Sequence, residues 1–271
     1  MKKNILTTVA LLILIGGGIA AYFYFQNTQP KPEPKPETVE IQEMGPATIL
    51  PDSPEPVARQ VLIAPSEKLE LPQLESTDNF MANALGSLVN NKKLMNIFIN
   101  DQLIHNIVVT IDNLPRKQVS MRVMPIKKAP GRFMTMESEG EMVISPENNA
   151  RYVPYMQFAE AVDPKQLVTL YVQLYPLFQE TYEELGYPDQ YFNDRMMIVL
   201  NNLLTAPEVT EPVQLVQPKF YYQYADPALE SRSIGQRILM RIGSDNEKII
   251  KTKLAAIKQE LMLHMHEKKI D

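Results

Sequence analysis

The chain has 271 residues, of which 45% are hydrophobic, and a formal net charge of -5 at neutral pH. Its lack of cysteine excludes disulfides, thiol catalysis, lipid-modified cysteine and covalently attached haem. It also lacks the Gly-x-Ser-x-Gly elbow, the Walker loop and the Gly-x-Gly-x-x-Gly motif, so no local motif specifies a reaction.

An uncharged apolar run over residues 5–25 follows Lys2 and Lys3. At about 1.5 Å per residue the run spans roughly 31 Å, the thickness of a hydrocarbon core. A cleaved signal peptide is the alternative, but the aromatic residues 22–25 extend the run and suit a membrane interface, which favours retention. We expect a single transmembrane helix, with residues 1–4 in the cytoplasm because the lysines precede the span, and with the rest exported.

Small residues recur within this run, because Gly16 and Gly17 lie four residues before Ala20 and Ala21. That spacing allows two membrane helices to approach closely, so a dimer through the transmembrane helix is one interpretation. The other is that small residues are simply common in membrane helices.

Residues 26–70 form a Pro-rich, disordered linker in this interpretation. Pro30, Pro32, Pro34 and Pro36 alternate with charged residues, which predicts an extended polyproline II spacer. Docking of a proline-recognising partner is the alternative to a plain tether, and the tether is favoured.

Residues 71–271 are long enough for one substantial core, and we expect a single, mainly α domain with a small β-hairpin or small sheet. Helices are expected from the caps at 76–78 through Leu88, over 94–98, over 101–112 despite a β-branched run, and over 147–161. Residues 116–144 suit extended structure, with a hairpin pairing 133–137 and 141–145.

The C-terminal half repeats strong helix signals. Asp163 caps a helix over 164–185 that Pro176 is expected to kink or split, and Asp189 is expected to open the next helix, which ends near Leu204. A strand within 213–224 and helices over 233–241 and 245–266 complete the domain. A continuous apolar seam runs along the last helix at Ile250, Leu254, Ile257 and Leu261, and we expect it to be core or one side of a helix–helix contact.

Candidate chemical groups are few. His264 and His266 point about 200° apart on a helix, so no metal site is expected, and His105 is interpreted as a buried, hydrogen-bonded residue. A hydrolase with paired carboxylates remains an alternative hypothesis, because its chemistry needs only two acids that the fold brings together. The candidate pairs are Glu183 with Glu184, Asp189 with Asp194, and Glu160 with Asp163.

Two side-chain clusters attract attention. No acid occurs between Asp112 and Glu137, and this stretch holds six basic residues: Arg116, Lys117, Arg122, Lys127, Lys128 and Arg132. We favour solvated or paired loop charges over a surface for anionic headgroups or an acidic partner, and nucleic acid is a poor partner outside the cytoplasm. An aromatic face on one helix is expected to be core: Tyr171, Tyr175, Phe178 and Tyr182.

Several sequence blocks in order, from Pro72 to about Leu261, carry a resemblance to a known family. They are Leu-Pro-Gln-Leu at 71–74 with Ser76 and Asp78, Val-Thr-Ile-Asp-Asn-Leu-Pro-Arg at 109–116, Pro-Gly-Arg-Phe at 130–133, Ala-Arg-Tyr at 150–152, Tyr-Pro-Leu at 175–177, Tyr-Glu-Glu-Leu-Gly-Tyr-Pro at 182–188, Tyr-Phe-Asn-Asp-Arg at 191–195, Ala-Asp-Pro-Ala-Leu-Glu at 225–230 and Gly-Gln at 235–236. The chain resembles the domain of unknown function 3014 family of proteobacteria. This resemblance implies an inner-membrane anchor, a periplasmic C-terminal domain and no assigned activity or catalytic residue.

The family blocks direct attention to four arginines as candidate binding residues, namely Arg116, Arg132, Arg151 and Arg195. One interpretation is structural, with the guanidinium groups pairing with Asp112, Asp194 or Asp226. The other is a shared anion site, which requires Arg116 and Arg132 to converge on one pocket without acidic partners.

The sequence therefore favours a single-pass envelope protein whose exported domain is non-catalytic and binds another envelope protein or component. We expect no cofactor, no catalytic residue and no metal ligand. The alternatives are an envelope-polymer hydrolase with paired carboxylates and a small-anion-binding domain.

Overall fold

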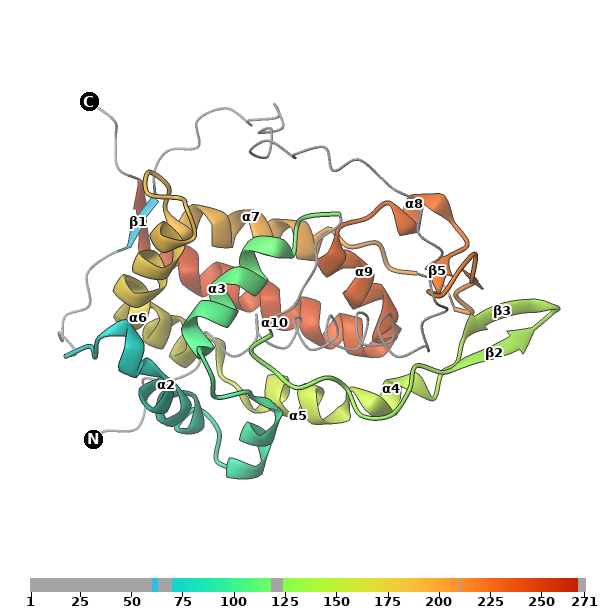
Figure 1. The fold of residues 1–271 in the computed structure, drawn as a ribbon, viewed down its shortest axis with the longest axis horizontal. Coiled ribbons are helices and arrows are strands. Elements are labelled where there is room, and N and C mark those ends of the chain that lie inside the picture. The colour runs from blue at the N-terminus through green and yellow to red at the C-terminus, as the bar shows by residue number, and fades with distance from the viewer. Residues whose placement is uncertain (1–59, 63–69, 118–123, 210, 268–271) are drawn as a thin grey trace, which may run out of the picture.

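The computed structural model describes residues 60–62, 70–117, 124–209 and 211–267 (Figure 1). The predicted transmembrane helix, residues 5–25, and most of the predicted linker lie outside these residues. Within them the chain forms a mainly helical body with small two-stranded sheets, which confirms the predicted fold class of the domain. None of the helices described is both long and apolar enough to cross a bilayer.

Helices make up most of the described residues. They are η1 (Leu74–Ser76), α2 (Thr77–Gly86), η2 (Lys92–Ile97), α3 (Leu103–Asn113), α4 (Asn148–Arg151), α5 (Val153–Ala161), α6 (Pro164–Glu184), α7 (Phe192–Leu204), α8 (Pro227–Glu230), α9 (Ile234–Arg241) and α10 (Ser244–Leu263). The antiparallel strand pairs are β1 (Gln60–Leu62) with β6 (Met265–Glu267), β2 (Thr135–Ser138) with β3 (Glu141–Ile144), and β4 (Leu215–Val216) with β5 (Gln223–Tyr224).

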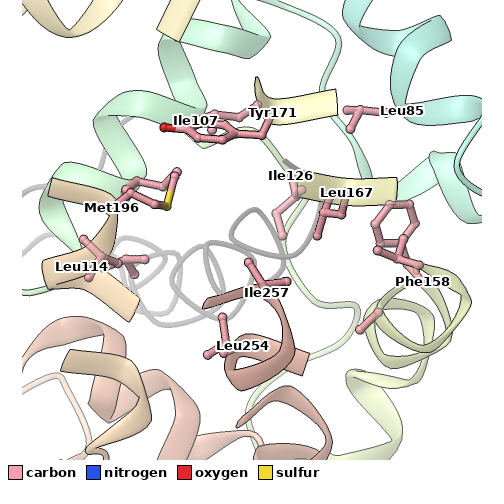
Figure 2. Packing of buried hydrophobic residues seen from close by; sticks show 14 of the residues in the cluster. Leu85, Ile107, Leu114, Ile126, Phe158, Leu167, Tyr171, Met196, Leu254 and Ile257 are labelled. Carbon is pink, nitrogen blue, oxygen red and sulfur yellow. The ribbon is translucent and has the colours of Figure 1, made fainter. Parts of the chain in front are cut away.

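Helix α10 lies at the centre of the body and contacts α5, α6, α7 and α9. Its predicted apolar seam is confirmed, because Ile250, Leu254, Ile257 and Leu261 are all buried. Figure 2 shows Leu254 and Ile257 within a cluster that also holds Leu114 and Phe158 from other helices and their ends. Burial of each such side chain contributes roughly 1.5–3 kcal/mol, so this seam organises the main core.

Helix α6 runs without interruption through Pro176, so the split expected as one outcome at this proline does not occur. The proline itself is exposed, and the aromatic face holds the helix together on both sides of it. Tyr171, Phe178 and Tyr182 are fully buried, as predicted for core residues. Tertiary packing of an apolar face outweighs the hydrogen bond that a proline removes.

Helix α7 begins at Phe192 and not near Asp189, because a side chain from α6 supplies the missing cap. Gln179 Oε1 accepts a hydrogen bond from the Phe192 amide at 2.9 Å, and Gln179 Nε2 donates to the Gln190 carbonyl at 2.8 Å. Helix α3 is also capped from a distance, since the Asp78 carboxylate accepts the amides of Gln102 and Leu103 at 2.9 and 2.8 Å. These caps satisfy orphan amides with long-range contacts that no local signal reveals.

Three segments differ from the sequence-based expectation. Gln60–Leu62 falls within the predicted linker but forms β1, which pairs with β6. Strand β6 also ends α10 earlier than expected, at Leu263. The short helix α8 was not expected, although Asp226 caps it as Asp163 caps α6, with side-chain bonds of 2.8 and 2.9 Å to Ala228 N and Gln166 N.

The predicted β2–β3 hairpin is confirmed and turns at Glu139 and Gly140, whose φ angles are 55° and 81°. Both positive φ values are typical of the tight turn that joins paired strands. This hairpin is joined to β4 by a bridge between Val143 and Gln214 and by a hydrogen bond from Ile144 N to Val213 O of 3.0 Å.

A second apolar cluster underlies β4 and β5, built on Val213, Leu215, Tyr224 and Met240. In Figure 1 the β2–β3 hairpin, β5 and α8 lie at one end of the molecule, and β1 with β6 lies at the other. The body therefore has two distinct ends, one formed by the chain termini of the domain and one by the hairpins and α8.

Candidate functional site

Two of the four candidate arginines meet at one carboxylate, and we call this group the Asp112 cluster: Asp112, Arg116, Tyr187 and Arg195. Arg116 Nη2 lies 2.7 Å from Asp112 Oδ2, and Arg195 Nε lies 2.9 Å from Oδ1. The Arg195 Nε approach is an ion-pair contact and not a well-directed hydrogen bond; its directed bond is donated by Nη2 to the Asp112 carbonyl oxygen. Tyr187 Oη accepts from Arg116 Nη2 at 2.9 Å.

The electrostatics of the Asp112 cluster stabilise the charged form of Arg116. Burial alone lowers the pKa of Arg116, but the charge of Asp112 and the contacts with Tyr187 raise the pKa above its ordinary value overall. The ring of Tyr187 also stacks on Tyr182, with 4.6 Å between centroids, and burial raises the pKa of Tyr182. The cluster joins the end of α3, the loop after α6 and the first turn of α7, which is the structural role that the sequence offered for these arginines.

The other two arginines lie elsewhere. Arg151 is buried in α4 and donates to the carbonyl oxygens of Pro130 and Gly131, at 2.9 and 3.4 Å, and to Asn148 Oδ1 at 3.1 Å. Arg132 is exposed on the loop before β2. Because Arg116 is paired with Asp112, the condition set for an anion site, two arginines without acidic partners, is not met.

One cleft lies beside α9 and has a volume of about 570 Å³. We call it the α9 cleft, and the lining residues used below are Lys117, Val216, Tyr224, Glu230, Ser231 and Arg237. They come from the segment after α3, from β4 and β5, and from α8 and α9, so distant parts of the sequence build one concave surface. A cleft of this volume is within the usual range for ligand sites.

An ion pair forms the floor of the α9 cleft. Arg237 Nη1 lies 2.5 Å from Glu230 Oε1, and Arg237 Nη2 donates to the Lys117 carbonyl oxygen at 2.7 Å. Glu230 also accepts from the Tyr224 amide through Oε2 at 2.9 Å. The charged groups of the floor are therefore already engaged in bonds within the protein.

Tyr224 connects this floor to the second apolar cluster. Its hydroxyl donates to the Arg237 carbonyl oxygen at 2.9 Å, and burial raises the pKa of the phenol. The guanidinium of Arg241 lies over the Tyr224 ring, 4.9 Å from its centroid, and donates to the Tyr222 carbonyl oxygen at 2.7 Å. Such a network fixes side-chain positions before any ligand arrives.

The Asp112 cluster and the α9 cleft share one backbone segment, residues 114–117. Ile234 N donates to the Arg116 carbonyl oxygen at 2.8 Å, and Gly235 N donates to the Leu114 carbonyl oxygen at 2.9 Å. The start of α9 is therefore hydrogen-bonded to the same segment whose Arg116 side chain belongs to the Asp112 cluster and whose Lys117 lines the cleft.

Sequence reasoning missed the residues that build the cleft floor. Arg237 and Arg241 lie four residues apart on a helix whose residues are all buried, and two arginines on a buried helix are a signal of an internal polar network. Glu230 lay within a family block, but no local pattern connected it with Arg237.

The acids proposed for a hydrolase are found mostly on helix surfaces or at caps. Glu183 is exposed and accepts from Gln179, Glu184, Asp189 and Glu160 are exposed, and Asp163 caps α6. A smaller groove of about 310 Å³ is lined by Glu208 and Asp226, but Asp226 already caps α8. The predicted buried role of His105 is not observed, because this residue is partly exposed.

The residues that the structure describes include no group of three or more His, Asp or Glu side chains placed to hold a metal ion. No curated protein and no solved structure matches the chain. A family model described as Protein of unknown function (DUF3014) matches residues 103–258, a range that contains α3 to α9, the Asp112 cluster and every lining residue of the α9 cleft named above. The chain therefore belongs to the DUF3014 family.

Proposed function

We propose that this protein is a membrane-tethered, non-catalytic binding protein of the cell envelope, and that its α9 cleft is the surface that receives a partner protein. One observation carries the proposal: the cleft is open and of ligand size, yet its buried ionisable groups are bonded to each other. A rigid cleft of this kind favours binding, because its side chains lose little freedom when a partner arrives.

The placement of β1 supports a tether at the far end of the domain. Strand β1 is the first described element of the chain, and it lies at the end of the molecule opposite α8 and β5 (Figure 1). A membrane anchor before residue 60 would attach at the β1 end. In this arrangement the α9 cleft faces away from the inner membrane, towards partners in the periplasm.

A hydrolase with paired carboxylates is the competing class of function. Its mechanism needs one carboxyl that donates a proton and a second that acts as base or nucleophile across a cleft. The α9 cleft has only Glu230 among the acids that line it, and Glu230 is held by Arg237 and the Tyr224 amide. Incubation of the full-length protein with purified peptidoglycan tests this class. Glu208 lines the smaller groove, so release of soluble fragments that is lost in Glu208→Gln would support a hydrolase over our proposal.

Site-specific photo-crosslinking in intact cells tests the binding proposal. A photoreactive amino acid is placed at Val216, which is exposed at the cleft, and in a matched variant at Glu180, which is exposed on α6. We expect a discrete adduct of defined mass from position 216 and none of that mass from position 180. Equal adducts at both positions, or no adduct at position 216, would contradict a partner-binding role for the cleft.

A further inference from the structure

We propose that the α9 cleft selects an extended, acidic peptide segment of its partner, with the Lys117 ammonium group as the selecting charge. This inference rests on the proposed function and adds the chemical class of the ligand. It follows from the positive charge that remains in the cleft after the ion pair between Arg237 and Glu230 is taken into account.

The balance of charge in the cleft is positive. Arg237 and Glu230 neutralise each other through their 2.5 Å ion pair. Lys117 is exposed, and no carboxylate among the described residues is ion-paired with it. Because low-dielectric walls focus such a field into a concave surface, an acidic ligand is favoured there.

The arrangement of donors favours a peptide over a small free anion. A site for phosphate or a small carboxylate needs several donors converging on one point. In this cleft both terminal nitrogens of Arg237 are engaged, with Glu230 and with the Lys117 carbonyl oxygen. The cleft therefore offers one ammonium group at its rim, which attracts a charge but does not enclose it.

The remaining walls offer contacts to a longer ligand. Val216 is 44% exposed, and Ser231, which also lines the cleft, is exposed as well. Phe220, 52% exposed, follows on the loop between β4 and β5. An extended segment with one acidic side chain near Lys117 and apolar side chains against Val216 matches this mixture.

Selection from short random peptides displayed on phage tests this inference without assuming a sequence. The target is the full chain in detergent micelles, and parallel selections use Lys117→Glu and the matched charge reversal Lys93→Glu, which changes an exposed lysine on η2. We expect the wild-type chain and Lys93→Glu to enrich peptides rich in Asp and Glu, and Lys117→Glu to lose this enrichment. Thermal unfolding of both variants verifies that they remain folded.

Binding of an enriched peptide is then measured by fluorescence anisotropy. We expect its affinity to fall about tenfold or more on Lys117→Glu and on replacing its acidic residues with Gln or Asn, and to change little on Lys93→Glu. Inorganic phosphate is the probe for a small-anion site.

Enrichment without acidic residues, no enrichment, or an equal loss in both charge reversals would overturn the inference. So would Lys117-dependent binding of phosphate without peptide binding. If the peptide experiments fail but the crosslinking experiment gives a specific adduct at position 216, the proposed function stands and only the acidic-peptide inference is wrong. Absence of that adduct would contradict both.

Discussion

Arg195 on α7 is ion-paired with Asp112 on α3, with 2.9 Å between Nε and Oδ1, across 83 residues of sequence. Asp112 is buried, and the same carboxylate also holds Arg116 at 2.7 Å. One carboxylate thus fixes α7 to the end of α3 and positions the segment 114–117. The Lys117 side of this segment lines the α9 cleft, and its carbonyl oxygens at Leu114 and Arg116 accept hydrogen bonds from the start of α9. The Asp112 carboxylate therefore contributes both to the stability of the fold and to the geometry of the α9 cleft.

The first prediction concerns this carboxylate. Asp112→Asn keeps the shape of the side chain but leaves the largely buried guanidinium of Arg195 without a counter-charge. We expect a loss of about 2–3 kcal/mol in the free energy of unfolding, below the full cost of a broken buried pair because 45% of the Arg116 side chain is exposed. Urea unfolding followed by circular dichroism measures this loss.

Asp101→Asn is the matched control, because Asp101 is exposed just before α3. We expect a change within about 0.5 kcal/mol there. Equal effects of the two substitutions would show that the Asp112 ion pairs contribute nothing beyond a surface charge.

The second prediction concerns the close approach of α9 to the end of α3. A Cβ atom at Gly235 would lie 2.5 Å from Leu203 Cδ2 and 3.2 Å from the Leu114 carbonyl oxygen. Because the carbonyl belongs to backbone that also accepts the Gly235 amide, it cannot move away without losing a hydrogen bond. We expect Gly235→Ala to lower the free energy of unfolding by about 1–3 kcal/mol, measured by urea unfolding.

Gly86→Ala at the end of α2 gives the opposite expectation, since a Cβ there meets no atom within 4 Å. Alanine has the higher helix propensity, so we expect a gain of up to about 1 kcal/mol. A stabilising Gly235→Ala would mean that α9 does not pack as closely against Leu114 as the structure has it.

The third prediction is a pH dependence that originates at Glu247. This residue is buried in α10, and burial raises the pKa of its carboxyl above 4.5, against the opposing effect of Lys251. Lys251 Nζ lies 2.8 Å from Glu247 Oε1 and donates to the Ala206 carbonyl oxygen at 2.6 Å. The folded state therefore holds the Glu247 proton more tightly than the unfolded state, and protonation favours folding.

The free energy of unfolding of the wild type relative to Glu247→Gln should consequently rise as the pH falls from neutral through the raised pKa towards 4.5. Above that pKa the ionised, buried carboxylate reduces the advantage of the wild type. A difference for Glu247 that falls as the pH is lowered would reverse the assigned sign.

Local signals were sufficient for much of the fold. The seam from Ile250 to Leu261, the Ser233 cap of α9 and the turn at Gly140 each follow from residues close in sequence, and the structure has all three. Helix α7 begins where Gln179, a residue of the preceding helix, caps it, so its start depends on tertiary structure. Continuity of α6 through Pro176 likewise depends on the packing of its neighbours.

The candidate site was predictable only in part for the same reason. Arg116 and Arg195 were singled out, and their partner Asp112 was among the acids considered. The ion pair at the cleft floor was not predicted. The hydrogen bond from Arg237 to the Lys117 carbonyl oxygen joins residues 120 positions apart, and its backbone acceptor has no sequence signature.

The last prediction concerns the anchor on which the proposed compartment depends. Residues 5–25 are apolar and uncharged, so the full-length chain should stay in the membrane fraction after alkaline extraction, while a chain lacking residues 1–25 should be released from it. Mass spectrometry of the membrane-bound protein should give the intact mass of 30.9 kDa, because we propose that the N-terminal segment is retained and not cleaved.

Fusion of alkaline phosphatase to the C-terminus should give active enzyme, because this reporter folds only after export. A shortened membrane-released product would indicate a signal peptide, and an inactive fusion would place the domain in the cytoplasm, where the choice of periplasmic partners no longer holds.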